Sequence, residues 1–115
     1  MAKFIYLYRG PSTELTPEQG AQRMAAFAAW TENLGPALID AGSPFGTSGS
    51  VRDDGTEGDT GDLIGYSIVE ADDLEGAKAR TDGLPFLANS DGKCAVEIFE
   101  LLPMNLKYAA RDRHR

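Results

Sequence analysis

Residues 3–10 read KFIYLYRG, and this stretch decides the fold. Its side chains alternate between the two faces of a predicted β-strand, because successive residues of a strand point in opposite directions. One face is aromatic and the other is aliphatic: Phe4, Tyr6 and Tyr8 lie opposite Ile5 and Leu7. Both faces of the sheet must therefore be covered, and a chain of 115 residues holds little material with which to cover them.

The composition is that of one ordinary globular domain. Of the 115 residues, 42% are hydrophobic and 25% are charged, values typical of water-soluble proteins. The single cysteine, Cys94, excludes an internal disulfide and a metal site built from several cysteines. No apolar run approaches the roughly 20 residues of a membrane span, and the first apolar run is shorter than the core of a signal peptide. We therefore expect a cytoplasmic protein that does not bind membranes.

Charge is distributed unevenly along the chain, whose net charge is −7. The last nine residues hold four cations and one carboxylate, a net +3, so residues 1–106 carry −10. Such an acidic body repels phosphate groups, which argues against nucleic acid as a partner. We interpret residues 1–104 as the folded domain and residues 105–115 as a basic, solvated C-terminal tail.

The segment TPEQ predicts the start of a helix. Thr16 suits the N-cap, Pro17 suits the first helical position, and Gln19 can close a capping box. Seven apolar or small side chains then fall within about half of the helical circumference: Met24, Phe27, Ala28, Trp30, Thr31, Leu34 and Leu38. This stripe predicts a helix that packs on a sheet.

The remaining elements follow from composition and from helix and turn signals. Proline removes a backbone donor, so Gly35-Pro36 should kink or break the first helix. The rest is assigned in order: a short helical piece at 36–42, a weak strand at 43–52, a polar surface loop at 53–62, the clear strand LIGYSIVEA at 63–71, a helix capped by Asp72 and Glu75, and a strand at 94–102.

This order, β-α-β-β-α-β, is the ferredoxin-like arrangement of the α+β class, an antiparallel four-stranded sheet with two helices. Two helices cover one face of such a sheet. The other face leaves apolar side chains in water, and exposed apolar area on that scale marks an interface. We therefore predict a homodimer in which two sheets pack face to face, a dimeric α+β barrel. Either row of residues 3–9, the aromatic or the aliphatic, can be the one under the helices.

Several segments resemble the YCII-related family, which includes the DGPF-type proteins. They are FIYLYRGP, AFAAWTENLGPALIDAGSPFG, GYSIVEADDLEGAKA and VEIFELLPM, and the resemblance spans about residues 3–104. It implies the fold of a dimeric α+β barrel, in a family whose members mostly have no assigned activity. Members suspected of enzymatic roles carry a histidine and an aspartate near a pocket. The only histidine of this chain is His114, so no histidine of the family can be carried over.

Three tyrosines are candidates for lining a small-molecule pocket. Tyr6, Tyr8 and Tyr66 lie on predicted strands, and they would bring three phenols into one cavity if they shared a face. The alternative is that they are core or interface aromatics whose hydroxyls reach the rim.

Three charged residues complete the candidate pocket. Arg9 or Lys3 can pair with Glu97 or Glu70 across the sheet, because a charge inside a strand requires a partner or water. In a functional reading, Arg9 holds a carboxylate ligand and Glu97 accepts a proton; otherwise they form a structural ion pair. Asp40, at the end of the first helical region, could face the same cleft or be an ordinary helix-end residue.

Three hypotheses about function remain open. The first is a homodimeric protein that binds a small molecule, in a cleft between sheet and helices or between the two sheets, without robust catalysis. The second is a cofactor-independent enzyme of the dimeric barrel type that uses an arginine, tyrosine or carboxylate as acid or base in a dry cavity. The third is a structural or interaction module with a filled barrel. No phosphate-loop, metal or nucleophile motif is present, so we expect no metal and no cofactor and cannot name catalytic residues.

Overall fold

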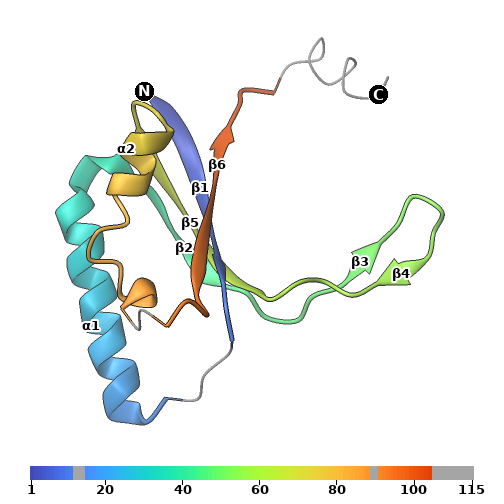
Figure 1. The fold of residues 1–115 in the computed structure, drawn as a ribbon, viewed down its shortest axis with the longest axis horizontal. Helices are drawn as coiled ribbons and strands as arrows, with labels where there is room; N and C mark the ends of the chain where they lie inside the picture. Colours follow the sequence, from blue (N-terminus) through green and yellow to red (C-terminus); the bar gives the residue numbers. More distant parts are fainter. Residues whose placement is uncertain (12–14, 89–90, 105–115) are drawn as a thin grey trace.

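The computed structural model describes residues 1–11, 15–88 and 91–104. A four-stranded antiparallel sheet forms one layer, and two helices lie on one side of it (Figure 1). The elements of this domain are β1 (Ala2–Arg9), α1 (Pro17–Leu34), β2 (Leu38–Pro44), β5 (Leu63–Ala71), α2 (Leu74–Ala79) and β6 (Ala95–Leu101). The strand order β2-β5-β1-β6 is that of the ferredoxin-like fold, so the predicted α+β class and order of elements are confirmed. The predicted basic tail, 105–115, lies outside the described residues.

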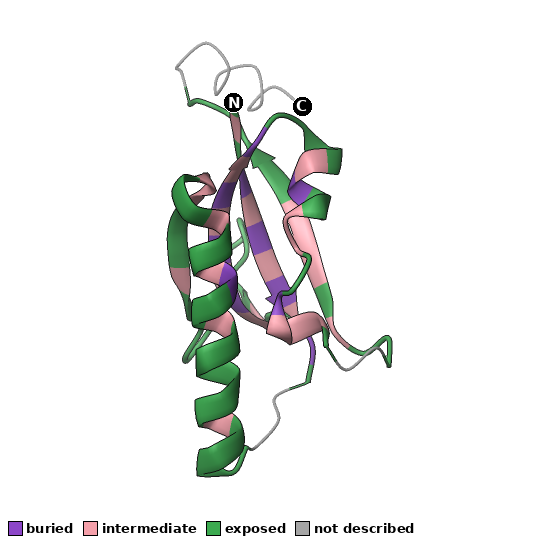
Figure 2. Ribbon diagram, turned by 90° about the vertical axis from the view of Figure 1, so that its left-hand side faces the viewer, coloured by how far each residue is buried: buried purple, intermediate pink, exposed green. Residues whose placement is uncertain are grey.

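The register of β1 shows which of its faces meets the helices. Tyr6 stands opposite Ser67 of β5 and Ile98 of β6, whereas Leu7 stands opposite Tyr66 and Glu97. Burial alternates along β1 and β5, with the aromatic row buried and the aliphatic row only half-buried (Figure 2). The aromatic residues of β1 therefore lie under the helices, and the aliphatic residues face the open side of the sheet.

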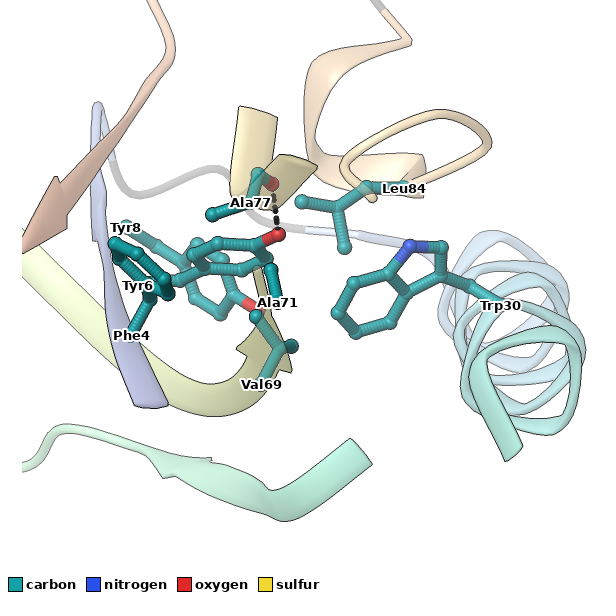
Figure 3. Packing of buried hydrophobic residues seen from close by; sticks show 8 residues of the cluster. All are labelled: Phe4, Tyr6, Tyr8, Trp30, Val69, Ala71, Ala77 and Leu84. Atoms are coloured by element: carbon teal, nitrogen blue, oxygen red, sulfur yellow. Dashed lines mark hydrogen bonds between the residues drawn. The ribbon is translucent and has the colours of Figure 1, made fainter. Parts of the chain in front are cut away.

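The core lies between the sheet and the helices (Figure 3). Trp30 reaches in from α1 with only 2% of its surface exposed, and its indole Nε1 donates a hydrogen bond of 2.9 Å to the carbonyl oxygen of Arg80. The cluster consists of Phe4, Tyr6, Tyr8, Trp30, Val69, Ala71, Ala77 and Leu84. Burying one large apolar side chain contributes about 1.5–3 kcal/mol, so this cluster is the main source of the domain's stability.

Both helices begin at capping residues. Gln19 N donates to Thr16 Oγ1 at 3.1 Å and Thr16 N donates to Gln19 Oε1 at 3.0 Å, which confirms the predicted capping box. The second cap lies one residue later than predicted, because Gly76 N donates to Asp73. The predicted apolar stripe is wrong at Met24, which is 68% exposed, and at Ala28, which is also exposed.

Within the described residues, no helix has both the length and the apolar composition that a membrane crossing requires.

The predicted short helix at 36–42 is wrong. A single 3-10 turn, Gly35–Ala37, follows α1, and β2 begins at Leu38. A strand forms here and not a helix because pairing with β5 satisfies the backbone hydrogen-bonding groups and lets Leu38 pack against the core. Gly42 does not end a helix: it has a φ of 83°, and a methyl group there would lie 1.6 Å from the carbonyl oxygen of Tyr66. Glycine is required because β2 approaches β5 so closely at this point.

The second strand of the sheet was also predicted too late in the chain. Of residues 43–52, only Ser43 and Pro44 belong to β2, while β3 (Ser50–Val51) pairs with β4 (Glu57–Gly58) in a separate ribbon. Part of the predicted polar loop at 53–62 is therefore a strand. The stretch carries too few alternating apolar side chains to extend the main sheet. Residues 45–62, here called the arm, project on the side of the sheet away from the helices (Figure 1).

Candidate functional site

The open face of the sheet is the surface that no helix covers (Figure 1). At its centre, Ile5, Leu7 and Ile68 remain half-buried. Towards β6 the apolar side chains are more exposed, 53% for Phe99 and 40% for Leu101. These residues share one face because the register pairs Ile5 with both Ile68 and Phe99. The described residues thus leave one broad apolar surface without cover.

A phenol and a carboxylate meet at the β2–β5 side of this face. Tyr66 Oη donates a hydrogen bond of 3.0 Å to Asp40 Oδ2. That hydrogen bond, and then the negative charge of Asp40, raises the pKa of the Tyr66 phenol. Phe45 stacks on Tyr66, with the two ring centroids 6.0 Å apart and the planes inclined by 17°. The stacked rings of Phe45 and Tyr66 therefore form an aromatic surface next to the Asp40 carboxylate, a charged hydrogen-bond acceptor.

An ion cluster lies at the end of β1. Arg9 Nε donates to Glu97 Oε2 at 2.7 Å, and its Nη1 bonds to Asp62 Oδ1. The hydrogen bond to Glu97, and next the one to Asp62, raises the pKa of Arg9. Of the cross-strand pairs expected between Arg9 or Lys3 and Glu97 or Glu70, the structure forms the one between Arg9 and Glu97. All three side chains are between 36% and 60% exposed, so the cluster remains open to water and to a charged ligand.

A groove of about 530 Å³ opens at the root of the arm, between Ser43–Ser48 on one side and Thr60, Gly61 and Leu63 on the other. Ser48 and Thr60 join the two sides through their hydroxyls, which are 2.7 Å apart. Phe45 lines the groove, and a methyl group on Gly61 would lie 3.1 Å from Arg9 Nη1. The groove therefore lies between the Phe45–Tyr66 stack and the ion cluster.

Tyr6 and Tyr8 lie on the other side of the sheet. Tyr6 donates to the carbonyl oxygen of Ala77, and burial, together with the neighbouring Tyr8, raises its pKa to about 12 (Figure 3). The Tyr8 hydroxyl donates a hydrogen bond of 2.6 Å to Ser67 Oγ, and the Ser67 hydroxyl donates one of 2.7 Å to Ala41 O. Burial also raises the pKa of Tyr8. Their hydroxyls are satisfied within the core, so the three tyrosines do not share a face.

Four of the six candidate residues therefore lie on the open side: Arg9, Asp40, Tyr66 and Glu97. Asp40 reaches this side from a strand and not from the end of a helix as predicted. Two residues that belong to this candidate site, Phe45 and Asp62, were not predicted from the sequence. A signal for Asp62 was available, because antiparallel pairing brings the residues just before a strand at 63 next to the end of a strand at 9.

The arrangement is suited to holding a small polar molecule. Asp40 supplies a hydrogen-bond acceptor, and Tyr66 next to it supplies a phenol. Phe45 supplies a ring on which a ligand can stack. Arg9 supplies a positive charge, which is already paired with Asp62 and Glu97. Among the described residues, no three His, Cys, Asp or Glu side chains gather as ligands for a metal ion.

Comparison with known proteins supports the fold. No protein-family model and no curated protein sequence matches the chain. Among solved structures, the chain is similar to the 5-chloro-2-hydroxyhydroquinone dehydrochlorinase TftG from Burkholderia phenoliruptrix AC1100, determined in complex with 2,5-dihydroxybenzoquinone. The likeness covers 92% of this chain and 97% of TftG, with a TM-score of 0.53 and 19% sequence identity. At that identity it supports the ferredoxin-like α+β fold and nothing finer.

Proposed function

We propose that the protein is a homodimer that binds a small hydroxylated ring compound between its two open sheet faces. The observation that carries this proposal is the Tyr66–Asp40 pair, set at the side of an apolar surface that lacks cover. The sequence segments quoted above resemble the YCII-related family, and a dimeric barrel agrees with that resemblance.

The dimer follows from the apolar character of the open face. Phe99 and Leu101 expose about half of their surfaces, and they continue the row of Ile5, Leu7 and Ile68. An exposed apolar patch that spans three neighbouring strands is typical of an interface. Two such faces can pack about 10 Å apart and bury each other's side chains, as in other sheet-on-sheet packing.

The ligand class follows from the groups beside that face. A flat ring can stack on Phe45 or Tyr66, and a ring hydroxyl can donate to Asp40 in a charge-assisted hydrogen bond. Arg9 lies across the groove and can attract a negatively charged oxygen of the same ligand. The dihydroxybenzoquinone bound to TftG, which has a similar fold, is a molecule of this class.

A cofactor-independent enzyme is the second candidate, and the same pair of residues favours it. Asp40 already accepts a hydrogen bond from a phenol, so it is placed to take a proton from a bound hydroxyl, with Tyr66 as the neighbouring acid. This reading differs from simple binding only in turnover, because both use the same residues.

The oligomeric state tests the first half of the proposal. Native mass spectrometry at low micromolar concentration should give twice the chain mass of 12.3 kDa. Leu7→Asp puts a charge in the middle of the open face and should give a folded monomer. Met24→Asp makes the same chemical change on the exposed side of α1 and should leave the dimer intact. A wild-type monomer would overturn the proposal.

Calorimetric titration with hydroquinone, whose hydroxyls keep their protons near neutral pH, tests the second half. The wild-type dimer should bind this probe, and Asp40→Ala should weaken binding at least about tenfold, the equivalent of about 1.4 kcal/mol for a charged hydrogen-bond partner. Glu32→Ala, an exposed carboxylate on α1, is the matched control and should bind normally. A dimer that does not bind the probe would instead support a filled barrel, the structural module.

A further inference from the structure

The arm (residues 45–62) has internal hydrogen bonds but no core of its own. Arg52 N donates to Thr56 O at 2.7 Å, and Arg52 Nη1 donates to Glu57 O at 3.1 Å. Every residue of the arm is exposed except Ser50 and Gly58, which are half-buried. A two-stranded ribbon is marginally stable in water by itself. The arm therefore requires packing that the described residues of its own chain do not supply.

The direction of the arm indicates where that packing comes from. It leaves the sheet at the ends of β2 and β5 and projects on the open side, away from α1 and α2 (Figure 1). Its apolar side chains are Phe45, which is 43% exposed at the root, and Val51, which is 76% exposed further out. Through its stack on Tyr66, Phe45 joins the arm to the apolar surface of the open face.

The size of the open face gives a second reason. Four strands spaced by about 4.8 Å, with about seven residues each at about 3.3 Å, give a face of about 19 by 23 Å, roughly 440 Å². A stable interface buries about 800 Å² on each partner. Side-chain relief enlarges the accessible area of the face beyond this projected area. The arm, on the same side, offers further surface for the contact.

Charge and apolar surface together indicate which part of a second copy the arm meets. Residues 53–62 hold five carboxylates and no cation: Asp53, Asp54, Glu57, Asp59 and Asp62. Two arms placed side by side would repel each other. The rest of residues 1–106 is acidic as well, so charge alone does not favour it. The exposed apolar side chains of the open face, Phe99 and Leu101, do, because they can cover the exposed Val51 of the arm.

We propose that the arm of each protomer packs on the sheet layer of a second copy of this chain and closes the groove at its own root against that copy. The ligand site is then composite, with Phe45, Asp40 and Tyr66 from one protomer and a wall from the other. This inference rests on the homodimer proposed above and adds the surface through which it is completed.

Paramagnetic labelling in mixed dimers tests this contact directly. A nitroxide is attached to Val51→Cys in a Cys94→Ser background. This spin-labelled protein, which carries no ¹⁵N, is mixed with ¹⁵N-labelled Cys94→Ser chains that carry no nitroxide. Any broadening in the ¹⁵N spectrum then arises between chains. Strong broadening should appear at sheet residues of the partner, whereas a label at Gln22→Cys, exposed on α1, should give none.

A second variant measures the contribution of the arm to assembly. Val51→Asp should raise the dimer dissociation constant about tenfold in sedimentation equilibrium, whereas Met24→Asp should not change it. If the wild type dimerises but Val51→Asp dimerises equally well and the label at residue 51 broadens no partner signal, the arm inference is wrong and the sheet-face dimer stands. If the wild type is a monomer, the homodimer proposal and the arm inference are both wrong.

Discussion

Tyr66 and Asp40 are joined by a hydrogen bond of 3.0 Å between the phenolic oxygen and Oδ2, although 26 residues separate them in the chain. The contact depends on the pairing of β2 with β5, in which Asp40 stands opposite Ile68 and Ser43 opposite Tyr66. The register shifts between these positions, at the place where Gly42 lies against the Tyr66 backbone. The irregularity of β2 thus brings the carboxylate to the phenol.

The ionisation of Tyr66 should report this contact. Its pKa is raised because Asp40 accepts the phenolic proton in a hydrogen bond and repels the phenolate. A raised pKa in the folded state means that the contact stabilises the fold below pH 10 and that this contribution is lost as pH rises through the folded pKa. In Asp40→Ala, tyrosinate absorbance should therefore appear at lower pH than in the wild type. Tyr66→Phe identifies the signal, and identical titrations of wild type and Asp40→Ala would contradict the assignment.

Tyr6 should make the fold sensitive to alkali. Burial raises its pKa to about 12 from an ordinary value of 10.0. Between those pH values the unfolded chain ionises Tyr6 and the folded chain does not, so the wild type loses about 2–3 kcal/mol of unfolding free energy. Tyr6→Phe removes this loss. It should be less stable than the wild type near neutral pH by about 1 kcal/mol, through the hydrogen bond lost to Ala77, and should overtake it near pH 11, where the loss in the wild type first exceeds that amount.

Urea unfolding at a series of pH values, followed by the fluorescence of the single tryptophan Trp30, measures that crossover. Parallel curves for the wild type and Tyr6→Phe from pH 9 to 12 would show that the phenol ionises with an ordinary pKa.

Ser67 should be more important for stability than its size indicates. Its side chain is completely buried, accepts from Tyr8 and donates to Ala41 O. Ser67→Ala leaves the buried Tyr8 hydroxyl without an acceptor and Ala41 O without this donor, at a cost of about 1–3 kcal/mol. Ser43→Ala removes an exposed hydroxyl from β2 and should change the unfolding free energy by less than about 0.5 kcal/mol. Equal effects in chemical denaturation would mean that the buried chain of hydrogen bonds is not formed.

The strands that the sequence predicted well are those with a near-continuous run of aliphatic and aromatic side chains. The stretch LIGYSIVEA forms β5 with the predicted bounds, and KFIYLYR lies within β1. Which face of β1 meets the helices could not be predicted, because both faces are apolar and the choice depends on where Trp30 and Ala77 pack. The ion pair of Arg9 and Glu97 was predictable because charges inside strands require partners.

The contact of Asp40 with Tyr66 could not be predicted, since it depends on β2. Residues 38–44 read LIDAGSP, which lacks the alternation of a strand and has a glycine that also suits the end of a helix. The decisive fact is that Gly42 lies against the backbone of β5, and this is a tertiary contact that no local pattern contains. The arm was missed for a related reason, because a ribbon with a polar, glycine-rich sequence looks like a loop.

Gly42 should tolerate no side chain. Its φ of 83° is strained for any other residue, and a methyl group would lie 1.6 Å from Tyr66 O, inside the sheet. Gly42→Ala must therefore separate β2 from β5 or change the backbone of both, and we expect a loss of at least about 2–3 kcal/mol in unfolding free energy.

Gly20→Ala is the matched control for this change, because it adds the same methyl group at a position in α1 where nothing lies within 4 Å. It should stabilise the protein by about 0.5–1 kcal/mol, since glycine is a poor helix former. Thermal unfolding of the two variants should thus shift in opposite directions. If Gly42→Ala unfolds at the wild-type temperature, β2 does not approach β5 as described, and the Tyr66–Asp40 contact is lost with it. If it is destabilised but still folded, Tyr66 should titrate at lower pH than in the wild type, because the displaced β2 carries Asp40 away from the phenol.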